Sequence, residues 1–163
     1  MIHCNNIVVP VDFSAPSRAA FDHACEFAEQ FGAALHVVHV RHLNRADAEF
    51  GGDAVVQTFD EFAQETERQM TEFLGDTGAF CFPVEPVFRD GKPVDEIVRY
   101  ADDIGADMII IGTHGRSGLM HIVMGSVAEG VIRNARCDVL TVHQREHDRY
   151  QSTALSESAA KST

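Results

Sequence analysis

Apolar residues fall along this chain in two alternating patterns. Short continuous runs rich in Val and Ile predict five buried strands, at residues 7–11, 34–40, 84–88, 107–112 and 138–143. Between these runs, apolar residues recur three or four positions apart, which predicts helices at residues 15–31, 59–74, 93–104 and from residue 126 onward. Strands that alternate with helices predict one parallel sheet with right-handed crossovers and helices on both faces.

Capping residues mark the expected helix ends. Ser14 is the expected N-cap of the first helix, with Pro16 in its first turn, and Gly32 and Gly105 follow the ends of two helices. Two helices carry stripes that we expect to face the core: Ala20, Phe21, Ala24, Cys25, Ala28 and Phe31 in the first, and Phe59, Phe62, Ala63, Thr66, Met70 and Phe73 in the second. Pro10 conflicts with a central strand because it lacks an N–H group, so we expect a bulge or a water molecule there.

A glycine-rich loop lies between the apolar run at residues 108–111 and the helix that starts at Ser126. Its sequence is Gly112-Thr113-His114-Gly115-Arg116-Ser117-Gly118, and Gly125-Ser126 follows. Glycines let backbone N–H groups approach an anion, and a helix start adds unpaired donors and the positive end of the helix dipole. The loop therefore indicates a phosphate site. Its spacing is neither Gly-x4-Gly-Lys-[Ser/Thr] nor Gly-x-Gly-x2-Gly, which disfavours P-loop NTPases and ordinary dinucleotide dehydrogenases.

Charge supports the same location for the ligand. The chain has 163 residues, 45% of them hydrophobic, which suits one domain, and its formal net charge of -12 disfavours a nucleic-acid or anionic-membrane partner. Residues 112–136 reverse this sign, because they contain three arginines and one glutamate. Within the loop, His114 and Arg116 are candidates to neutralise phosphate oxygens, and the alternative is ordinary solvated loop charge.

The cysteine and histidine spacings do not indicate a metal site. Four cysteines without Cys-x2-Cys or zinc spacing are expected to be reduced thiols. With no signal peptide and no apolar run long enough to span a bilayer, we expect a cytoplasmic protein without membrane insertion. His36, His39 and His42 are close in sequence, but strand alternation points His36 and His39 to opposite faces, which disfavours a shared metal ion.

Four motifs together resemble the universal stress protein family. They are Gly112-x2-Gly115-x9-Gly125-Ser126, Val9-Pro10-Val11-Asp12-Phe13-Ser14, Gly91-x-Pro93 before Ile97, and Cys137-Asp138-Val139-Leu140. The resemblance covers about residues 4–143, and the complete glycine motif is similar to that of the ATP-binding branch. Asp138 stands where the family commonly has proline, which affects only the expected start of the last strand.

This resemblance implies a fold and a ligand. The fold is a doubly wound α/β domain in residues 1–143, adenine nucleotide alpha hydrolase-like, with five parallel strands in the order 3-2-1-4-5. The ligand is ATP, ADP or AMP, with Mg²⁺ held through the phosphates. In such a sheet, ligands bind outside the carboxyl ends of the strands where the winding reverses, and Asp12 and Gly112 end the two strands concerned. The expected nucleotide-binding residues are Pro10, Val11, Asp12, Val40, Gly112, Thr113, His114, Gly115, Arg116, Gly125, Ser126 and Val127.

Two of these residues have particular expected roles. Val40 resembles the family position whose backbone meets adenine. Asp12 is expected to accept a hydrogen bond from the ribose or base, or to contact Mg²⁺ through water, and the alternative is a helix-capping or Asx-turn carboxylate. No protein side chain is expected to bind a metal directly.

The end of the chain bears on assembly. The last strand lies at an edge of the expected sheet, and residues 139–142 are too apolar to leave that edge open to water. We therefore expect a two-fold homodimer through residues 138–143. Residues 144–163 are polar, with Leu155 the one large aliphatic residue, and are expected to form a disordered tail.

Three functions are consistent with these patterns. The first is a regulatory stress protein that binds ATP and signals its occupancy to a partner protein. The second is a slow ATP hydrolase or an adenylyl-transferring enzyme, which is disfavoured because no general base and no second carboxylate near Asp12 is evident, so no catalytic residue is assigned. The third is a nucleotide-free interaction protein in which the glycine motif forms only turns.

Overall fold

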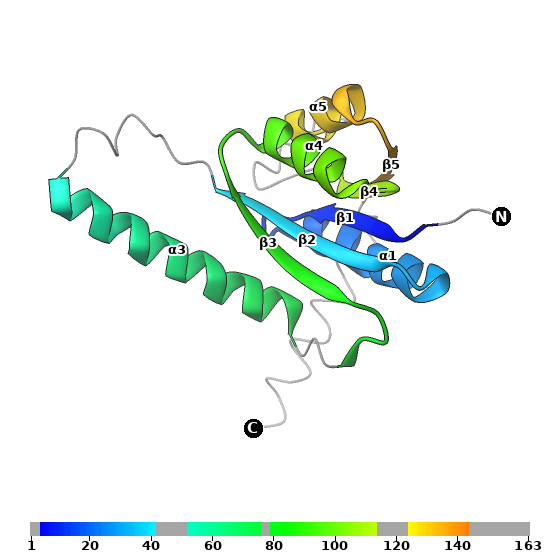
Figure 1. Ribbon diagram of the computed structural model, residues 1–163, viewed down its shortest axis with the longest axis horizontal. Coiled ribbons are helices and arrows are strands. Elements are labelled where there is room, and N and C mark those ends of the chain that lie inside the picture. Colours follow the sequence, from blue (N-terminus) through cyan, green and yellow to red (C-terminus); the bar gives the residue numbers. More distant parts are fainter. Residues whose placement is uncertain (1–3, 42–51, 76–78, 114–123, 144–163) are drawn as a thin grey trace, which may run out of the picture.

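Strands and helices alternate along the whole described chain (Figure 1). The structure, a computed structural model, describes residues 4–41, 52–75, 79–113 and 124–143, and for residues 52–60 the backbone alone. Its elements are β1 (Asn6–Pro10), α1 (Ala15–Phe31), β2 (Ala34–Arg41), α3 (Gly52–Leu74), β3 (Val84–Asp90), α4 (Pro93–Ile104), β4 (Met108–Gly112), α5 (Ser126–Asn134) and β5 (Asp138–Val142). The expected tail at residues 144–163 and most of the glycine loop lie outside the described residues.

The five strands form one parallel sheet in the order β3-β2-β1-β4-β5. The α/β class and the strand order 3-2-1-4-5 expected from the sequence are therefore confirmed. This order places β1 and β4 side by side in the middle of the sheet, and the chain winds outward from them in opposite directions. The reversal of winding lies between these two strands, where a ligand site is expected.

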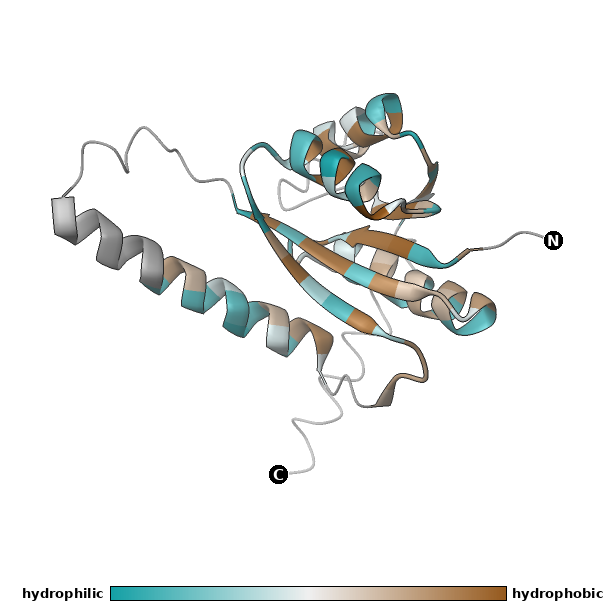
Figure 2. Ribbon diagram, viewed as in Figure 1, coloured by the Kyte–Doolittle hydropathy of each residue, from teal (hydrophilic) through white to brown (hydrophobic). Residues whose placement is uncertain are grey.

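Helices cover both faces of the sheet, and successive strand residues are divided between them. Ile7 and Val9 pack with α1 and the last turns of α3, whereas Val8 packs with α4 and α5. Because both faces are covered, the central strand β1 is largely apolar, whereas the edge strand β3 carries several polar residues (Figure 2).

The predicted helix caps are present. The Ser14 hydroxyl accepts a hydrogen bond from the Ser17 amide at the start of α1, although the distance of 3.4 Å is long. Gly32 and Gly105 follow α1 and α4 in the left-handed conformation, with φ of 68° and 61°. These caps mark the start of α1 and the ends of α1 and α4, and both helices begin beside the carboxyl end of the sheet.

Two aromatic residues expected in the core are exposed, and α3 is longer than predicted. Phe31 is 38% exposed because it is the last residue of α1, and Phe62 is 47% exposed. Helix α3 begins at Gly52 instead of near residue 59, and its Gly52 end extends away from the sheet (Figure 1). Within residues 61–74 the buried side chains are Thr66, Met70 and Leu74, so α3 contacts the core through its last turns.

Pro10 is accommodated without a bulge in the β1–β2 ladder, so the bulge that was one of the two expectations is wrong, and the water molecule stays a prediction. The β1–β2 register runs without interruption to Pro10↔Val38, and the Val11 N–H then donates to the Val38 carbonyl at 2.8 Å. Successive backbone nitrogens in a strand point to opposite neighbours, so the nitrogen of Pro10 faces β4. Pairing with β4 ends at Val8↔Ile109, directly before the point where the nitrogen of Pro10 would have to donate the next ladder bond.

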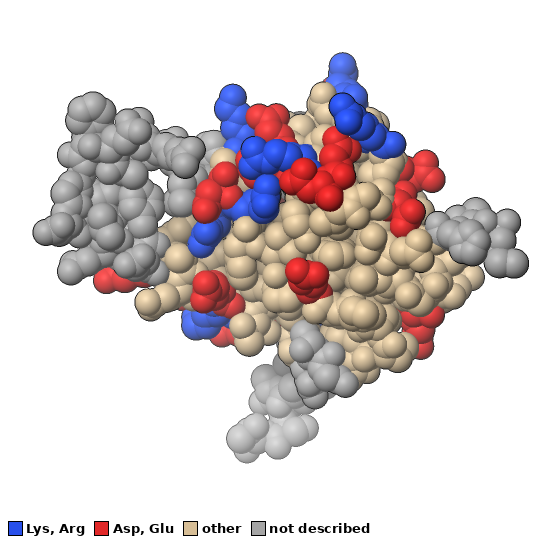
Figure 3. All heavy atoms as spheres, viewed as in Figure 1, with Lys and Arg blue, Asp and Glu red and all other residues tan. Residues whose placement is uncertain are grey.

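A buried carboxylate fixes the start of α4. Glu96 is 6% exposed and accepts hydrogen bonds from Arg89 at 3.2 Å and from Arg99. Gly91, with φ of 145°, lies against the Glu96 side chain, so that a Cβ there would be 3.1 Å from it. Acidic and basic side chains gather over α4 in the space-filling view (Figure 3). The network ties the β3–α4 turn to the sheet.

Gly112 provides a test of how closely β4 and α1 must approach. A Cβ added at Gly112 would lie 2.7 Å from the Pro16 carbonyl oxygen, which is backbone and cannot rotate away. We expect Gly112→Ala to lower the free energy of unfolding by about 1–3 kcal/mol through this overpacking. Urea denaturation followed by circular dichroism measures the change, and an unchanged unfolding midpoint would contradict the argument.

Candidate functional site

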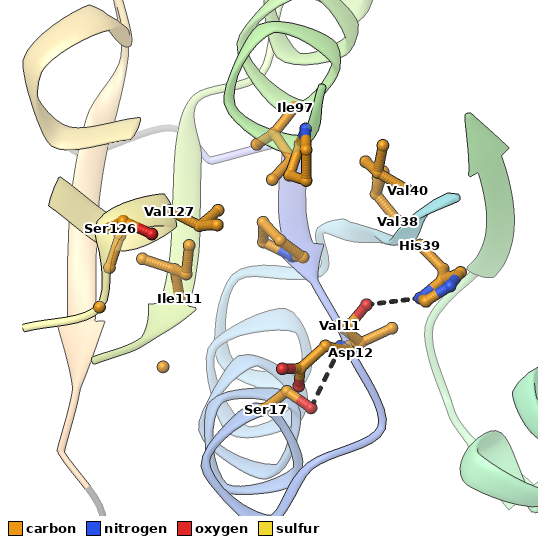
Figure 4. A pocket seen from close by; sticks show the side chains of 15 residues that line it. Val11, Asp12, Ser17, Val38, His39, Val40, Ile97, Ile111, Ser126 and Val127 are labelled. Atoms are coloured by element: carbon orange, nitrogen blue, oxygen red, sulfur yellow. Dashed lines mark hydrogen bonds between the residues drawn. The ribbon is translucent and has the colours of Figure 1, made fainter. Parts of the chain in front are cut away.

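A cavity of about 260 Å³ opens where β1 and β4 part at the carboxyl end of the sheet (Figure 4). Six elements or their flanking turns contribute to its wall: the end of β1, the start of α1, the end of β2, the start of α4, the end of β4 and the start of α5. The lining residues are Pro10, Val11, Asp12, Ser17, Val38, His39, Val40, Pro93, Ile97, Ile111, Gly112, Gly125, Ser126, Val127 and Ala128. The cavity thus lies at the topological switch point.

The wall combines apolar and polar parts. Apolar side chains from four elements face the space, among them Val40, Ile97, Ile111 and Val127 (Figure 4). Polar groups come from the β1–α1 turn and from the first turn of α5. An apolar pocket with a few convergent polar groups is the usual form of a small-molecule site.

Most of the residues predicted from the sequence meet at this cavity. Eight of them line it: Pro10, Val11, Asp12, Val40, Gly112, Gly125, Ser126 and Val127. The β1–α1 segment and the Gly125-Ser126 segment are far apart in the chain and form opposite sides of one space (Figure 4). The predicted His114, Gly115 and Arg116 lie outside the described residues.

Thr113 does not line the cavity, although the sequence predicted it to bind. It is 6% exposed, and its N–H group donates to the Val142 carbonyl at 3.0 Å. Its hydroxyl lies 3.1 Å from Nδ1 of His143. The Thr113 carbonyl accepts the N–H of Gly125, so this residue joins the two ends of the glycine loop to each other and to β5.

Asp12 forms the Asx turn that was its alternative interpretation, and it also lines the cavity. Its Oδ1 accepts hydrogen bonds from the Ser14 amide at 3.1 Å and from the Ser14 hydroxyl. The Ser17 hydroxyl donates to the Ser14 carbonyl at 2.9 Å and lies 3.4 Å from the Asp12 amide. These contacts hold the carboxylate at one side of the cavity, so the capping role and a binding role are compatible.

The start of α5 presents backbone donors to the cavity. Gly125 is its N-cap, without a side-chain cap, and the first intrahelical bond runs from Glu129 to the Gly125 carbonyl at 3.0 Å. The amides of Ser126, Val127 and Ala128 therefore have no acceptor within the helix, and all three residues line the cavity. Together with the helix dipole they form a site suited to an anion. The Gly125 amide is engaged by Thr113 and positions this turn.

Several lining residues were not predicted from the sequence: Ser17, Val38, His39, Pro93, Ile97, Ile111 and Ala128. Val38 shares a strand face with Val40, so alternation could have found it. Pro93 and Ile97 belong to a motif that was noted only as a family marker. His39 points to the other face and reaches the site through Val11, whose carbonyl lies 2.8 Å from its Nδ1.

The histidines are separated as strand alternation predicts. His36 lies against α4, with Nδ1 2.9 Å from the Tyr100 hydroxyl and 3.5 Å from Glu85, whereas His39 contacts Val11 on the opposite side of the sheet. No group of three or more possible metal ligands is present among the described residues. His42 lies outside them.

In the described part of the chain, no helix has both the length and the apolar character needed to cross a bilayer.

Comparison with known proteins gives a consistent result. The family model of the Universal stress protein family matches residues 3–143. Universal stress protein MJ0531 of Methanocaldococcus jannaschii is 36% identical over 139 residues, which cover 83% of this chain and 80% of the relative. Universal stress protein MJ0577 of the same organism is 32% identical over 157 residues, covering 85% and 94% of the two chains.

Solved structures show the same relationship. The structure of MJ0577 superposes with a TM-score of 0.78 at 28% identity and covers 89% of this chain and 99% of that one. A universal stress protein in complex with cAMP superposes with a TM-score of 0.58 at 26% identity, covering 87% and 98%. With a family match over residues 3–143 and a relative 36% identical over most of both chains, this chain belongs to the universal stress protein family.

Proposed function

We propose that this protein binds an adenine nucleotide in the cavity at the β1/β4 switch point and signals its occupancy to a partner protein. The observation that carries the proposal is the convergence of the α5 amides and the Asp12 turn on one largely apolar cavity. An apolar space beside an anion site matches a molecule with a flat base at one end and phosphate at the other. A structural relative in complex with cAMP supports the same ligand class.

The wall suggests how the nucleotide is held. Val38, Val40 and Ile97 offer an apolar surface for the base, with the Val40 backbone beside it. The amides at the start of α5 receive the phosphates, together with the predicted loop residues His114, Gly115 and Arg116. In this arrangement Asp12 would accept a hydrogen bond from a ribose hydroxyl.

Mg²⁺ fits this site only as part of the nucleotide complex. Among the described lining residues Asp12 is the one carboxylate, and its Oδ1 is engaged by Ser14. Mg²⁺ commonly uses one or two carboxylates together with substrate phosphates and water. The metal is therefore expected to bind the phosphates and to contact Asp12 through water. The same single, engaged carboxylate favours a regulatory binding role over hydrolysis.

Two further parts of the proposal concern assembly and location. β5 is an edge strand whose Val139, Leu140 and Thr141 are only half-buried in one chain. A second copy paired through residues 138–143 would cover that edge.

The cysteines bear on location. All four are free thiols, which supports a reducing compartment such as the cytoplasm; they are Cys4, Cys25, Cys81 and Cys137.

Calorimetric titration with ATP, ADP and AMP, each with and without Mg²⁺, tests the ligand. We expect one saturable site per chain. Mg²⁺ should raise the affinity for ATP more than the affinity for AMP, because Mg²⁺ binds best to adjacent phosphates and AMP has only one. Absence of saturable binding by all three nucleotides would contradict the proposed function.

Gly125→Val tests the position of the phosphates. The backbone of Gly125, at φ -70° and ψ 149°, is one that valine adopts readily, so the fold should be retained. The added side chain crowds the start of α5, and we expect nucleotide affinity to fall by about tenfold or more. Ala135→Val is a matched control, because Ala135 has similar backbone angles at the other end of α5 and does not line the cavity. Unchanged affinity in Gly125→Val would refute this placement.

Sedimentation equilibrium tests the dimer. We expect a dimer at micromolar concentration, and we expect Thr141→Lys to shift it toward monomer because two like charges would meet across the paired edges. Gln30→Lys adds the same charge at an exposed position on α1 and should leave the dimer intact. Wild-type protein that sediments only as monomer would end the dimer proposal.

A further inference from the structure

The turn between β1 and α1 holds a bulky residue in a strained conformation. Phe13 has φ of 63°, and no other non-glycine residue among those described has a positive φ. A bulky side chain rarely adopts this conformation, which persists where the surrounding structure over-determines it. Phe13 directly follows Asp12, so the same turn sets the position of a residue in the cavity wall.

One side of the Phe13 ring faces the cavity wall. It stacks on His39 with the ring centroids 4.5 Å apart and the planes 23° from parallel. His39 lines the cavity, and its Nδ1 lies 2.8 Å from the carbonyl of Val11, which lines it too. The conformation of Phe13 is therefore tied to the backbone at the end of β1.

The other contact of the ring is with α3. Phe73, one residue before the end of α3, meets Phe13 edge to face at 5.8 Å and Phe21 at 5.4 Å. The Arg18 guanidinium lies 5.0 Å from the Phe73 ring centroid and also donates to the Phe73 carbonyl. Phe73 does not line the cavity, so its contact with the site passes through Phe13.

Helix α3 is attached to the domain mainly at this end. Met70 and Leu74 are buried in the core shared with α1, whereas Phe62 is 47% exposed and the Gly52 end extends away (Figure 1). The Phe73 contacts and the buried Thr66, Met70 and Leu74 therefore form its anchor.

We propose that nucleotide binding and the anchoring of α3 are coupled through the stack of Phe73, Phe13 and His39, an inference that rests on the proposed nucleotide site. Phe13 and Phe73 are positioning residues. The rings on both sides of Phe13 hold the strained turn, and the turn in turn places Val11 and Asp12 in the cavity wall. Loosening α3 lets the turn relax and lowers nucleotide affinity.

Coupling between two sites is reciprocal. If an anchored α3 raises the affinity for nucleotide by some factor, then bound nucleotide shifts the equilibrium of α3 toward the anchored state by the same factor. A partner protein that displaces the last turns of α3 would therefore release nucleotide, and nucleotide would oppose that partner. This gives the proposed signal a structural output at α3.

Phe73→Leu tests the coupling, because leucine keeps an apolar side chain and removes the ring. We expect the Kd for ATP, measured by calorimetry, to rise by about fivefold or more. In the wild-type protein, saturating ATP should slow hydrogen exchange at the amides of residues 70–74, and this protection should be lost in Phe73→Leu. Phe62→Leu is the matched control on the same helix and should preserve both the Kd and the protection.

The outcomes separate the two proposals. ATP binding with an unchanged Kd in Phe73→Leu, or wild-type exchange at residues 70–74 that ATP does not alter, would overturn the coupling alone. Wild-type protein that binds no ATP would overturn the proposed function and the coupling with it. If Phe73→Leu does not fold, Arg18→Gln replaces it, because Arg18 is exposed, holds Phe73 and does not line the cavity; an unchanged Kd and retained protection in that variant would equally overturn the coupling.

Discussion

The parting of β1 from β4 after the pair Val8↔Ile109 is the constraint on which the site depends. Two parallel strands that stayed paired to their ends would leave no space between them. Pro10 prevents this, since its nitrogen faces β4 and cannot donate, while pairing of the same strand with β2 continues to Val38. β1 therefore remains anchored on one side and open on the other. The cavity occupies the open side, and α4 and α5 close it from above the sheet.

Close packing on each side of this opening determines its shape. Gly112 lets the end of β4 approach the first turn of α1 at Pro16, so the β1–α1 turn is held beside the cavity. On the opposite face, Gly130 in α5 lies close enough to Val94 in α4 that a Cβ there would be 2.6 Å from the valine side chain. These two glycines thus bring the end of β4 close to α1, and α5 close to α4, on either side of the cavity. Part of what is recognised as a glycine-rich signature serves packing.

Much of the architecture could be predicted because it follows local rules. Val and Ile runs, helix stripes and capping residues such as Ser14 and Gly32 identify elements directly, and alternation of strands with helices limits the topology. The strand order and the ATP-binding expectation came from the family resemblance. The meeting of Asp12 with Gly112 followed from that order, because they lie at the ends of β1 and β4, the two strands side by side in the middle of the sheet.

What could not be predicted depends on long-range contacts. An apolar stripe indicates which side of a helix faces inward but not where the sheet beneath it ends, so Phe31 and Phe62 were placed in the core although they are exposed. Thr113 sits within the glycine motif, but its partners are Val142, the last residue of β5, and His143, which follows it, and no sequence pattern joins them to Thr113. The contribution of His39 depends on a carbonyl of another strand. In each case, the exposure or the bonding partner of the side chain depends on residues distant in the sequence.

The hydrogen bond from the Gly125 amide to the Thr113 carbonyl has an energetic consequence. It fixes the first turn of α5 relative to β4 in the protein without any bound molecule. Three amides at the start of α5 are thus aligned before any anion binds. The binding free energy is therefore not reduced by the entropic cost of ordering them. The entropic cost of ordering the site then falls on its other parts, such as the β1–α1 turn. Affinity therefore depends on how firmly the surrounding contacts hold that turn.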